Sequence, residues 1–432
     1  MNRKVYREIF ESLEETPVID THEHLPFDEK KYINDGNDVL TTYLAHYIRS
    51  DVVSAGLNPQ DLDFVCNSRE NLLRRWKIVE PYWEASRYTG YGRVLDLAAS
   101  ALYNIDEINS NTIEELNEKY LKLKQPGIYH HILHEKCNIK VAVVDIWSRD
   151  VDLSAGNPIF RAVWQPLNYI MPTLAENDVL EDIESRLNIR VSTLDDFLEA
   201  FDRDLEYRLQ KYGVPLLKCA IAYHRSIKFE KVEYKTAKEA FATAFDYYQR
   251  TRVLDFSEPL QDFMMHYIFK AANDKGLVFQ FHTGLLEGNG NILANSDPTL
   301  MNDLFLMYPN IKFDLFHIGY PYFYETAALA KIFPNVFIDM CWSHIISSNI
   351  SKLALAEFLD TVPYTKISAF GGDYLFPDGV LGHLQLAKMN VSSVLASKVE
   401  QGFFGVEKAV KIGQALFYDN PKRILGLNRN GS

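Results

Sequence analysis

Several short apolar runs of the chain end in side chains that bind metal ions. In chain order these side chains are His22, His24, His282, His317 and Asp373. On a strand, positions two apart point to the same face, so His22 and His24 can converge on one ion. Imidazoles together with a carboxylate are ligands suited to Zn²⁺ or a similar divalent ion. The predicted chemistry is therefore that of a metal centre.

The runs that carry these residues are expected to be strands. Eight β-branched, apolar segments recur along the chain, at 18–24, 138–145, 159–167, 214–222, 277–283, 312–318, 336–342 and 366–373. Most are apolar on both faces, as parallel strands buried between a core and a layer of helices are.

The segments between the strands carry helical patterns. Residues 192–212 begin with Ser192-Thr193 and have acids three positions on, as in a capping box, and Gly213 ends the pattern. Residues 257–275 repeat this arrangement, with Pro259 in the first turn. Such βα units predict an α/β protein with a (β/α)8 TIM barrel, and an open doubly wound sheet is the alternative. We expect one domain over 1–432.

The connection after the first strand is far longer than a βα crossover requires. Helical patterning at 69–87 and 113–124 predicts that residues 30–137 form a mostly helical insertion over the barrel mouth. Long insertions of this kind are typical of lids and binding elements. Because no linker composition flanks it, a separately folding domain is the weaker interpretation.

Active sites of such barrels lie at the C-terminal ends of the strands, where the five side chains named above are predicted to lie. A single His-x-His pair or one strand-end aspartate is weak evidence for a metal, since either is often a packed residue. Their joint occurrence at one end of four strands predicts a shared site.

The motifs around these residues resemble those of a known superfamily. DTHEH at 20–24, FHTG at 281–284, FH at 316–317 and GGD at 371–373 resemble the metal-site motifs of the amidohydrolase superfamily. DNPKRILGL at 419–427 resembles the closing helix of its amidohydrolase-related branch. The stretch 277–427 is similar to the amidohydrolase-like domain fused to some glutamine synthetases, and the long insertion is similar to that of uronate isomerases.

The resemblance implies a catalytic centre. His22, His24, His282 and Asp373 would hold one divalent metal, Zn²⁺ by expectation, which would make hydroxide available near neutral pH. Asp373 would take the proton of the water and pass it to a leaving group. His317 would polarise the substrate carbonyl or stabilise the oxyanion, or else be a core histidine bonded to a backbone carbonyl.

Lys218 interrupts the apolar run of the fourth strand, where an unpaired buried ammonium is costly. In binuclear members of the superfamily a carboxylated lysine at this strand bridges two metals. A lysine that contacts the substrate, or one that faces outward, fits the same position. We favour the substrate contact and one metal ion, with two ions if Lys218 is carboxylated.

Further substrate contacts are predicted around the strand ends. The main candidates are Tyr223, Arg225, Trp342 and His46, with Arg225 able to bind a carboxylate in two-pronged fashion. Weaker candidates are Arg49, Glu287, Asn289, Asn291 and His344. Cys219 and Cys341 lack a nearby base pattern and are expected to be buried thiols.

Composition limits the partners. Lys+Arg 45 against Asp+Glu 58 gives a net charge of −13, which disfavours nucleic acid and anionic membranes. No apolar run reaches transmembrane length, the N-terminus lacks a signal core, and the four cysteines show no paired spacing, so a cytoplasmic protein with reduced thiols is expected. A small-molecule substrate is expected, and a homo-oligomer is compatible with the sequence.

The leading hypothesis is a metal-dependent hydrolase of a C–N or C–O bond in a small, carboxylated metabolite. A uronate-type aldose–ketose isomerase and a metal-dependent decarboxylase are the alternatives on the same site. A catalytically silent barrel that only binds a partner is disfavoured by the intact ligand set. Fold analogy alone does not choose among them.

Overall fold

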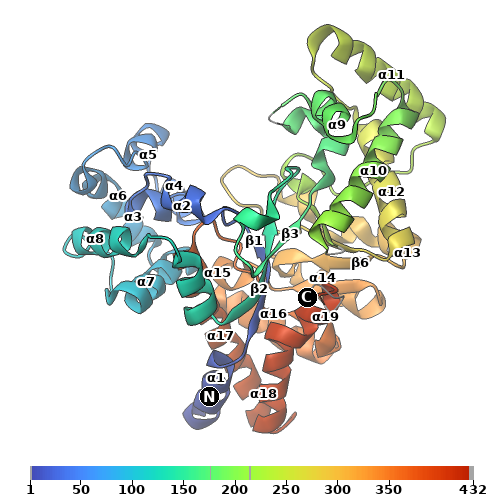
Figure 1. Ribbon diagram of the computed structural model, residues 1–432. Coiled ribbons are helices and arrows are strands. Elements are labelled where there is room, and N and C mark those ends of the chain that lie inside the picture. The colour runs from blue at the N-terminus through green and yellow to red at the C-terminus, as the bar shows by residue number, and fades with distance from the viewer. Residues whose placement is uncertain (1, 176, 214–215, 428–432) are drawn as a thin grey trace.

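In the part of the chain that the structure describes, eight parallel strands form the centre of the molecule (Figure 1). The computed structural model describes residues 2–175, 177–213 and 216–427. The strands are β1 (Val18–Glu23), β2 (Ile139–Asp145), β3 (Phe160–Val163), β4 (Leu216–Cys219), β5 (Val278–Phe281), β6 (Lys312–Leu315), β7 (Val336–Asp339) and β8 (Ile367–Ser368). All eight predicted strands are present, although positions 214 and 215 of the predicted fourth strand lie outside the described residues.

Two parallel sheets, β1-β2-β3 and β4 to β8 in sequence order, join into one ring. At one junction the Lys218 N–H donates to the Trp164 carbonyl at 3.0 Å, and at the other the Thr21 N–H donates to the Phe370 carbonyl at 3.2 Å. The ring follows chain order throughout, as in a (β/α)8 barrel. The predicted barrel is confirmed, and the open sheet is excluded.

Helices surround the strands. They are α1 (Arg3–Glu14), α9 (Val179–Leu187), α10 (Leu194–Tyr212), α11 (Tyr234–Thr251), α12 (Glu258–Lys275), α13 (Asn302–Met307), α14 (Phe323–Ile332), α15 (Ser343–Ile346), α16 (Ser348–Thr361), α17 (Pro377–Glu400), α18 (Val406–Gln414) and α19 (Asn420–Ile424), with a π-helix at Ala415–Asp419. Helix α10 begins with the predicted capping box, in which Thr193 and Asp196 bond reciprocally, and ends at Gly213 with φ +67°.

Between β1 and β2 the chain is helical. It forms α2 (Glu29–Ile33), α3 (Val39–Tyr43), α4 (Ile48–Ser54), α5 (Pro59–Val65), α6 (Leu72–Ser86), α7 (Gly90–Tyr103), α8 (Ile113–Leu123) and a π-helix (His130–Lys136). In Figure 1 these helices flank the strands on one side, and α9 to α12 flank them on the other. We call residues 30–137 the insertion, as in the sequence prediction.

Several predicted strands continue past the true strand ends, because their last residues turn into the site. The run 336–342 leaves the strand after Asp339, and Trp342 has φ +59°. His317 after β6 and Asp373 after β8 also have positive φ, +63° and +58°. Positive φ costs a non-glycine residue free energy, and such residues cluster at functional sites.

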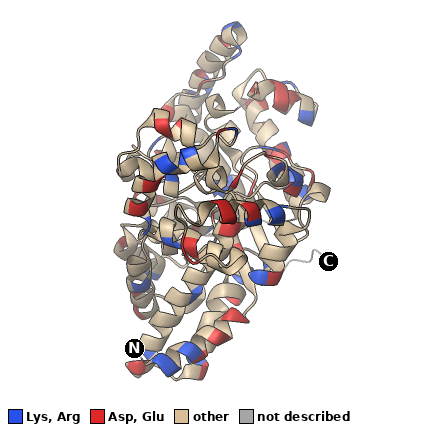
Figure 2. Cartoon of the chain, turned by 90° about the vertical axis from the view of Figure 1, so that its left-hand side faces the viewer, with Lys and Arg blue, Asp and Glu red and all other residues tan. Residues whose placement is uncertain are grey.

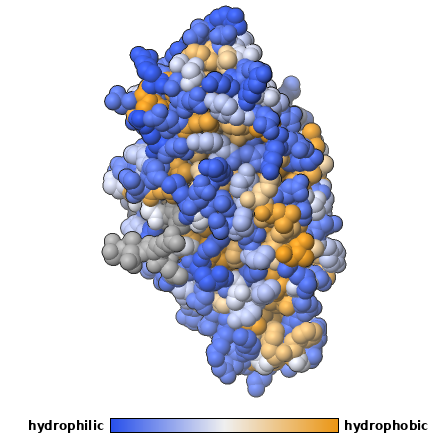
Figure 3. Space-filling model, turned by 90° about the vertical axis from the view of Figure 1, so that its right-hand side faces the viewer, coloured by the Kyte–Doolittle hydropathy of each residue, from blue (hydrophilic) through white to orange (hydrophobic). Residues whose placement is uncertain are grey.

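Charged and apolar side chains are mixed on the surface. Acidic and basic residues alternate over the face that carries the insertion (Figure 2). The opposite face shows apolar areas within a hydrophilic surface (Figure 3), and exposed large apolar side chains occur on α13, α14 and α16, at Leu306, Ile332 and Leu353. No helix within the described residues combines the length and apolarity that crossing a bilayer requires.

Candidate active site

His22, His24 and Asp373 converge at the C-terminal end of the barrel. The Nε2 atom of His24 lies 3.2 Å from Asp373 Oδ1, and that of His22 lies 3.6 Å from the same oxygen. One ligand atom from each of these residues lies within 4.8 Å of the others, close enough to share one ion. The period of two along β1 thus brings both imidazoles to the strand end that faces Asp373.

His282 and His317 form a second pair beside this cluster. His282 Nε2 bonds the Leu285 carbonyl at 2.8 Å, and His317 Nδ1 bonds the Cys341 carbonyl at 2.9 Å. A carbonyl only accepts, so these nitrogens carry the protons and the two remaining nitrogens carry lone pairs. Those nitrogens face each other at 3.2 Å, and His317 Nε2 lies 3.9 Å from Asp373 Oδ2. Two facing lone pairs are stable only beside a cation or a shared proton.

These residues therefore fit a divalent metal. The group that shares one centre most closely is His22, His24 and Asp373, with a second grouping of His317, Cys341 and Asp373. The predicted ligand His282 lies beside this group, with His317 between its ring and the Asp373 carboxylate. One ring nitrogen of His317 binds a backbone carbonyl, as the core-histidine alternative predicts, and the other faces His282 Nδ1. Its action on a substrate stays a prediction.

Electrostatics favour an ionised Asp373 and neutral rings at His282 and His317. Burial opposes a charge on His24, but its hydrogen bond to Asp373 outweighs burial and raises the pKa of His24. Burial opposes the charge on Asp373, but the hydrogen bond from His24 and the nearby His22 outweigh it and hold its pKa well below the usual value. Burial lowers the pKa of His317 to about 4, assisted by the Lys218 charge. Burial and the neighbouring His317 hold the pKa of His282 well below its usual value.

The main chain around Asp373 is held by hydrogen bonds from three elements. From β1, the Asp20 and Glu23 carboxylates accept the N–H groups of Gly372 and Tyr374, each at 2.9 Å. From α17, His383 Nδ1 bonds the Gly372 carbonyl at 3.0 Å. A side chain at Gly372 would collide with the Glu23 carboxylate, so glycine is required there.

The third element is the insertion. The Tyr47 hydroxyl donates to the Asp373 carbonyl at 2.6 Å, and the Tyr47 ring stacks on Trp342 at 4.9 Å. The insertion thus holds the backbone of Asp373 in its strained conformation. Sequence reasoning missed Tyr47, although it directly follows the predicted contact His46.

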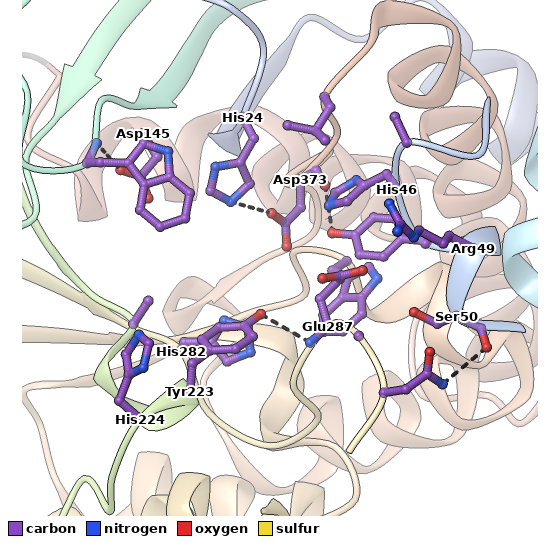
Figure 4. A pocket seen from close by; sticks show the side chains of 18 of the residues that line it. His24, His46, Arg49, Ser50, Asp145, Tyr223, His224, His282, Glu287 and Asp373 are labelled. Atoms are coloured by element: carbon purple, nitrogen blue, oxygen red, sulfur yellow. Dashed lines mark hydrogen bonds and ion pairs between the residues drawn. The ribbon is translucent and has the colours of Figure 1, made fainter. Parts of the chain in front are cut away.

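A cavity of about 750 Å³ opens above the centre (Figure 4). Its walls come from the strand ends, from α4 and α5 of the insertion, and from the loop after β5. That volume is in the range of pockets that enclose small molecules. His24, His282 and Asp373 line it, so the candidate metal centre faces the cavity.

The structure brings four of the five predicted substrate contacts to this cavity, namely Lys218, Tyr223, Trp342 and His46. Arg225 is the exception, because it is not among the residues that line the cavity. Its guanidinium is bound by the Asp262 carboxylate at 2.7 Å and by Gln261 Oε1 at 3.1 Å, away from the cavity lining. The guanidinium that was expected to bind a substrate carboxylate is therefore bound by a buried carboxylate on α12.

The weaker candidates divide in the same way. Arg49, Glu287 and Asn289 line the cavity. Asn291 instead closes its own turn by bonding the Glu287 carbonyl at 2.7 Å, and His344 is buried with Nε2 on the Ala369 carbonyl at 2.9 Å. Asn289 also donates to the Ser50 carbonyl and the Ser54 hydroxyl, each at 3.2 Å, and so joins the β5 loop to α4.

Lys218 is buried at the bottom of the cavity. Its Nζ lies 3.8 Å from the centroid of the Phe316 ring, and within the described residues no carboxylate forms an ion pair with it. Burial lowers its pKa, and the nearby Asp373 and Asp145 oppose that shift. A cation with one aromatic neighbour has donors left for a ligand.

Asp145, Gln165 and Trp147 also line the cavity, and sequence reasoning missed them. Gln165 Nε2 donates to Asp145 Oδ2 at 2.5 Å, which fixes both side chains beside Lys218. Trp147 is 48% exposed and stacks on His24 at 5.4 Å. Asp145 ends a predicted strand and could have been found, because active sites of such barrels lie at the C-terminal ends of the strands. Trp147 lies in a loop without a distinctive pattern.

Comparisons with known proteins agree with this architecture. A family model described as amidohydrolase matches residues 186–427, more than half of the chain. The chain therefore belongs to the amidohydrolase family, and is an enzyme of that family. The resemblance inferred from the motifs is confirmed.

Individual relatives are distant. The chain is 28% identical over 177 residues to protein fluG of Emericella nidulans, which is 40% of this chain and 20% of fluG, so the match spans about a fifth of that relative. A uronate isomerase from Thermotoga maritima matches with a TM-score of 0.78 at 17% identity over 98% of both chains. A structure from Lactobacillus casei, described as a metal-dependent hydrolase, matches with a TM-score of 0.67 at 18% identity over 98% of both chains.

Proposed function

We propose that the protein is a metal-dependent hydrolase that cleaves a C–N (amide) or C–O bond of a small carboxylated metabolite. The observation that carries the proposal is the convergence of His22, His24 and Asp373 on one point, with His317 Nε2 facing the same point. A divalent metal held there, Zn²⁺ by preference, supplies activation of a water nucleophile at neutral pH.

Asp373 moves the proton in this proposal. Its carboxylate is ionised and lies at the edge of the cavity, so it can accept the proton of the attacking water and pass it to the leaving nitrogen or oxygen. The hydrogen bonds on Gly372 and on the Asp373 carbonyl keep this carboxylate in place during the transfer.

His317 and Lys218 act on the substrate. In its neutral form His317 presents the Nε2 lone pair, so it accepts a hydrogen bond from the attacking water or from a substrate N–H or O–H and orients that group. Lys218 binds the substrate carboxylate through its ammonium at the bottom of the cavity. One ion suffices for this arrangement, and carboxylation of Lys218 would add a second.

The test combines metal content with turnover. The chelator-treated protein is reloaded with Zn²⁺ or Mn²⁺ and offered a panel of N-acyl amino acids and lactones, and free amine or acid is measured. We expect about one metal per chain and activity only in the loaded protein. Full activity of the metal-free protein would contradict the proposal.

The isomerase is the second candidate, favoured by the structural match to a uronate isomerase over 98% of both chains. On this alternative, Asp373 and His317 would move a proton between two carbons and their oxygens. Incubation of the metal-loaded protein with glucuronate decides between them. Formation of the keto-sugar supports the isomerase, and an unchanged sugar with hydrolysis of the panel supports the hydrolase.

A further inference from the structure

The two ends of the cavity differ in polarity. Its inner end consists of buried polar side chains at the strand ends, and Lys218, Asp145, Gln165 and Asp373 are each at most 5% exposed. Gln165 already binds Asp145, so Lys218 is the group left to bind a charged ligand. This end suits a carboxylate next to the bond that reacts.

The outer end is largely apolar. The insertion contributes Ala45, Val53, Pro59 and Leu62 to the wall. Trp147 and the half-buried Leu167 complete it from the loops after β2 and β3, and Leu375 does so after β8. Ala45, Pro59 and Trp147 are exposed, which places the apolar surface toward solvent.

The charges at this end do not offer a second anion site. Arg49 is exposed in the same wall, and Glu287 of the opposite loop faces it across the cavity mouth (Figure 4). Burial raises the pKa of Glu287 and the nearby Arg49 opposes that shift, so the two side chains interact electrostatically. The hydroxyl groups of a polar ligand would lose hydrogen bonds to water against this apolar wall, which is unfavourable. An apolar group of the ligand would instead remove the wall from water, which is favourable.

We propose that the substrate is an amphipathic acid, of the class of N-acyl amino acids with a long or aromatic acyl group. This inference rests on the proposed hydrolase function of the same site. The carboxylate binds Lys218, the scissile amide lies beside Asp373 and His317, and the acyl group extends along Trp147, Leu167 and Val53. Hydrolysis adds water across the amide, so the products are the free amino acid and the fatty or aromatic acid.

Binding can be measured without turnover. N-acetylglycine and N-octanoylglycine are titrated into metal-stripped protein by calorimetry. Since one fully buried methylene changes affinity by up to about fourfold, we expect the octanoyl compound to bind at least about tenfold more tightly. Equal or weaker binding of the octanoyl compound overturns the inference.

Turnover separates this inference from the proposed function. With the metal-loaded enzyme, kcat/KM for release of glycine is expected to be at least about tenfold higher for the octanoyl substrate. Hydrolysis of both substrates at equal kcat/KM contradicts only the amphipathic class. Preferential binding of the octanoyl compound without hydrolysis of any compound contradicts only the hydrolase.

Variants locate each end. Val53→Asn and Leu167→Asn are expected to lower the octanoyl-to-acetyl binding ratio about fivefold, and Leu353→Asn, 47% exposed on α16, is the matched control that leaves it unchanged. Lys218→Gln is expected to abolish the preference for N-octanoylglycine over its uncharged amide. An unchanged ratio in both wall variants, with melting temperatures preserved, overturns the inference.

Discussion

The strand-end floor of the cavity and the wall that the insertion builds over it differ in what holds them. Floor side chains such as Asp373 and His317 are buried, and their backbones or rings are bonded to neighbouring strands. The wall is largely apolar and more exposed than the floor, and hydrogen bonds of Tyr43, Tyr47 and Tyr103 join the insertion to the barrel. The difference indicates that the floor provides rigid geometry for chemistry, whereas the wall can vary with the ligand.

Removal of the floor carboxylate should have the largest effect. Asp373→Asn keeps the shape of the side chain but removes the charge and the proton acceptor, so we expect kcat/KM to fall by more than about 10³-fold. Elemental analysis should show reduced metal per chain. Glu239→Gln on the outside of α11 is the control, and comparable activity of the two variants would contradict the role of Asp373.

His317→Ala tests the floor at a residue that contacts the centre from the side. We expect kcat to fall by about 10²–10³-fold while roughly one metal per chain is retained, because the loss concerns a hydrogen bond that orients the reacting groups. Loss of the metal together with activity would instead make His317 a ligand. Kinetics and elemental analysis on the same preparation distinguish the two.

The junction of insertion and barrel should respond to pH. Asp378 on α17 accepts hydrogen bonds from Tyr43 at 3.0 Å and Tyr103 at 2.7 Å, and burial raises its pKa to about 6. A folded-state pKa above the unfolded value favours folding at low pH, and this contribution is lost as pH rises from about 4 to about 6.

In Asp378→Asn that pH dependence is absent. Relative to the variant, the wild type should therefore lose about 2–3 kcal/mol of unfolding free energy between pH 4 and pH 7. Urea unfolding of both proteins at several pH values measures the difference, and the other buried carboxyls cancel because both proteins contain them. A pH-independent difference would contradict the assignment.

Tyr47 tests how the wall and the floor are coupled, because it belongs to the wall and contacts the floor. Tyr47→Phe removes one hydrogen bond to the Asp373 carbonyl, so we expect kcat to fall about three- to tenfold with KM little changed. Tyr43→Phe removes a hydrogen bond between the same insertion and Asp378, and is expected to reduce stability by about 1 kcal/mol without changing kcat. Equal losses of kcat in Tyr47→Phe and Tyr43→Phe would show that both substitutions act through stability, and would contradict a positioning role of Tyr47.

Much of the floor was predictable because its residues follow a strict spacing. His22 and His24 share a face through the two-residue period of β1, and the ends of parallel strands meet at one edge of the barrel. The strand ends themselves were predicted too long, because Trp342 and Asp373 leave the strand in positive-φ turns that hydrophobicity does not signal. The ion pair of Arg225 with Asp262 could not be predicted, because Asp262 lies on a helix farther along the chain.

The order of strands and helices, the family and the side chains at the strand ends could all be inferred from the amino-acid sequence. These depend on local periodicity, which acts between residues a few positions apart. The tertiary structure decided which of those side chains meet, that His282 and His317 face each other, and that Tyr47 and Trp147 belong to the site. Such contacts join segments up to hundreds of positions apart, and only the closed barrel with its insertion brings them together.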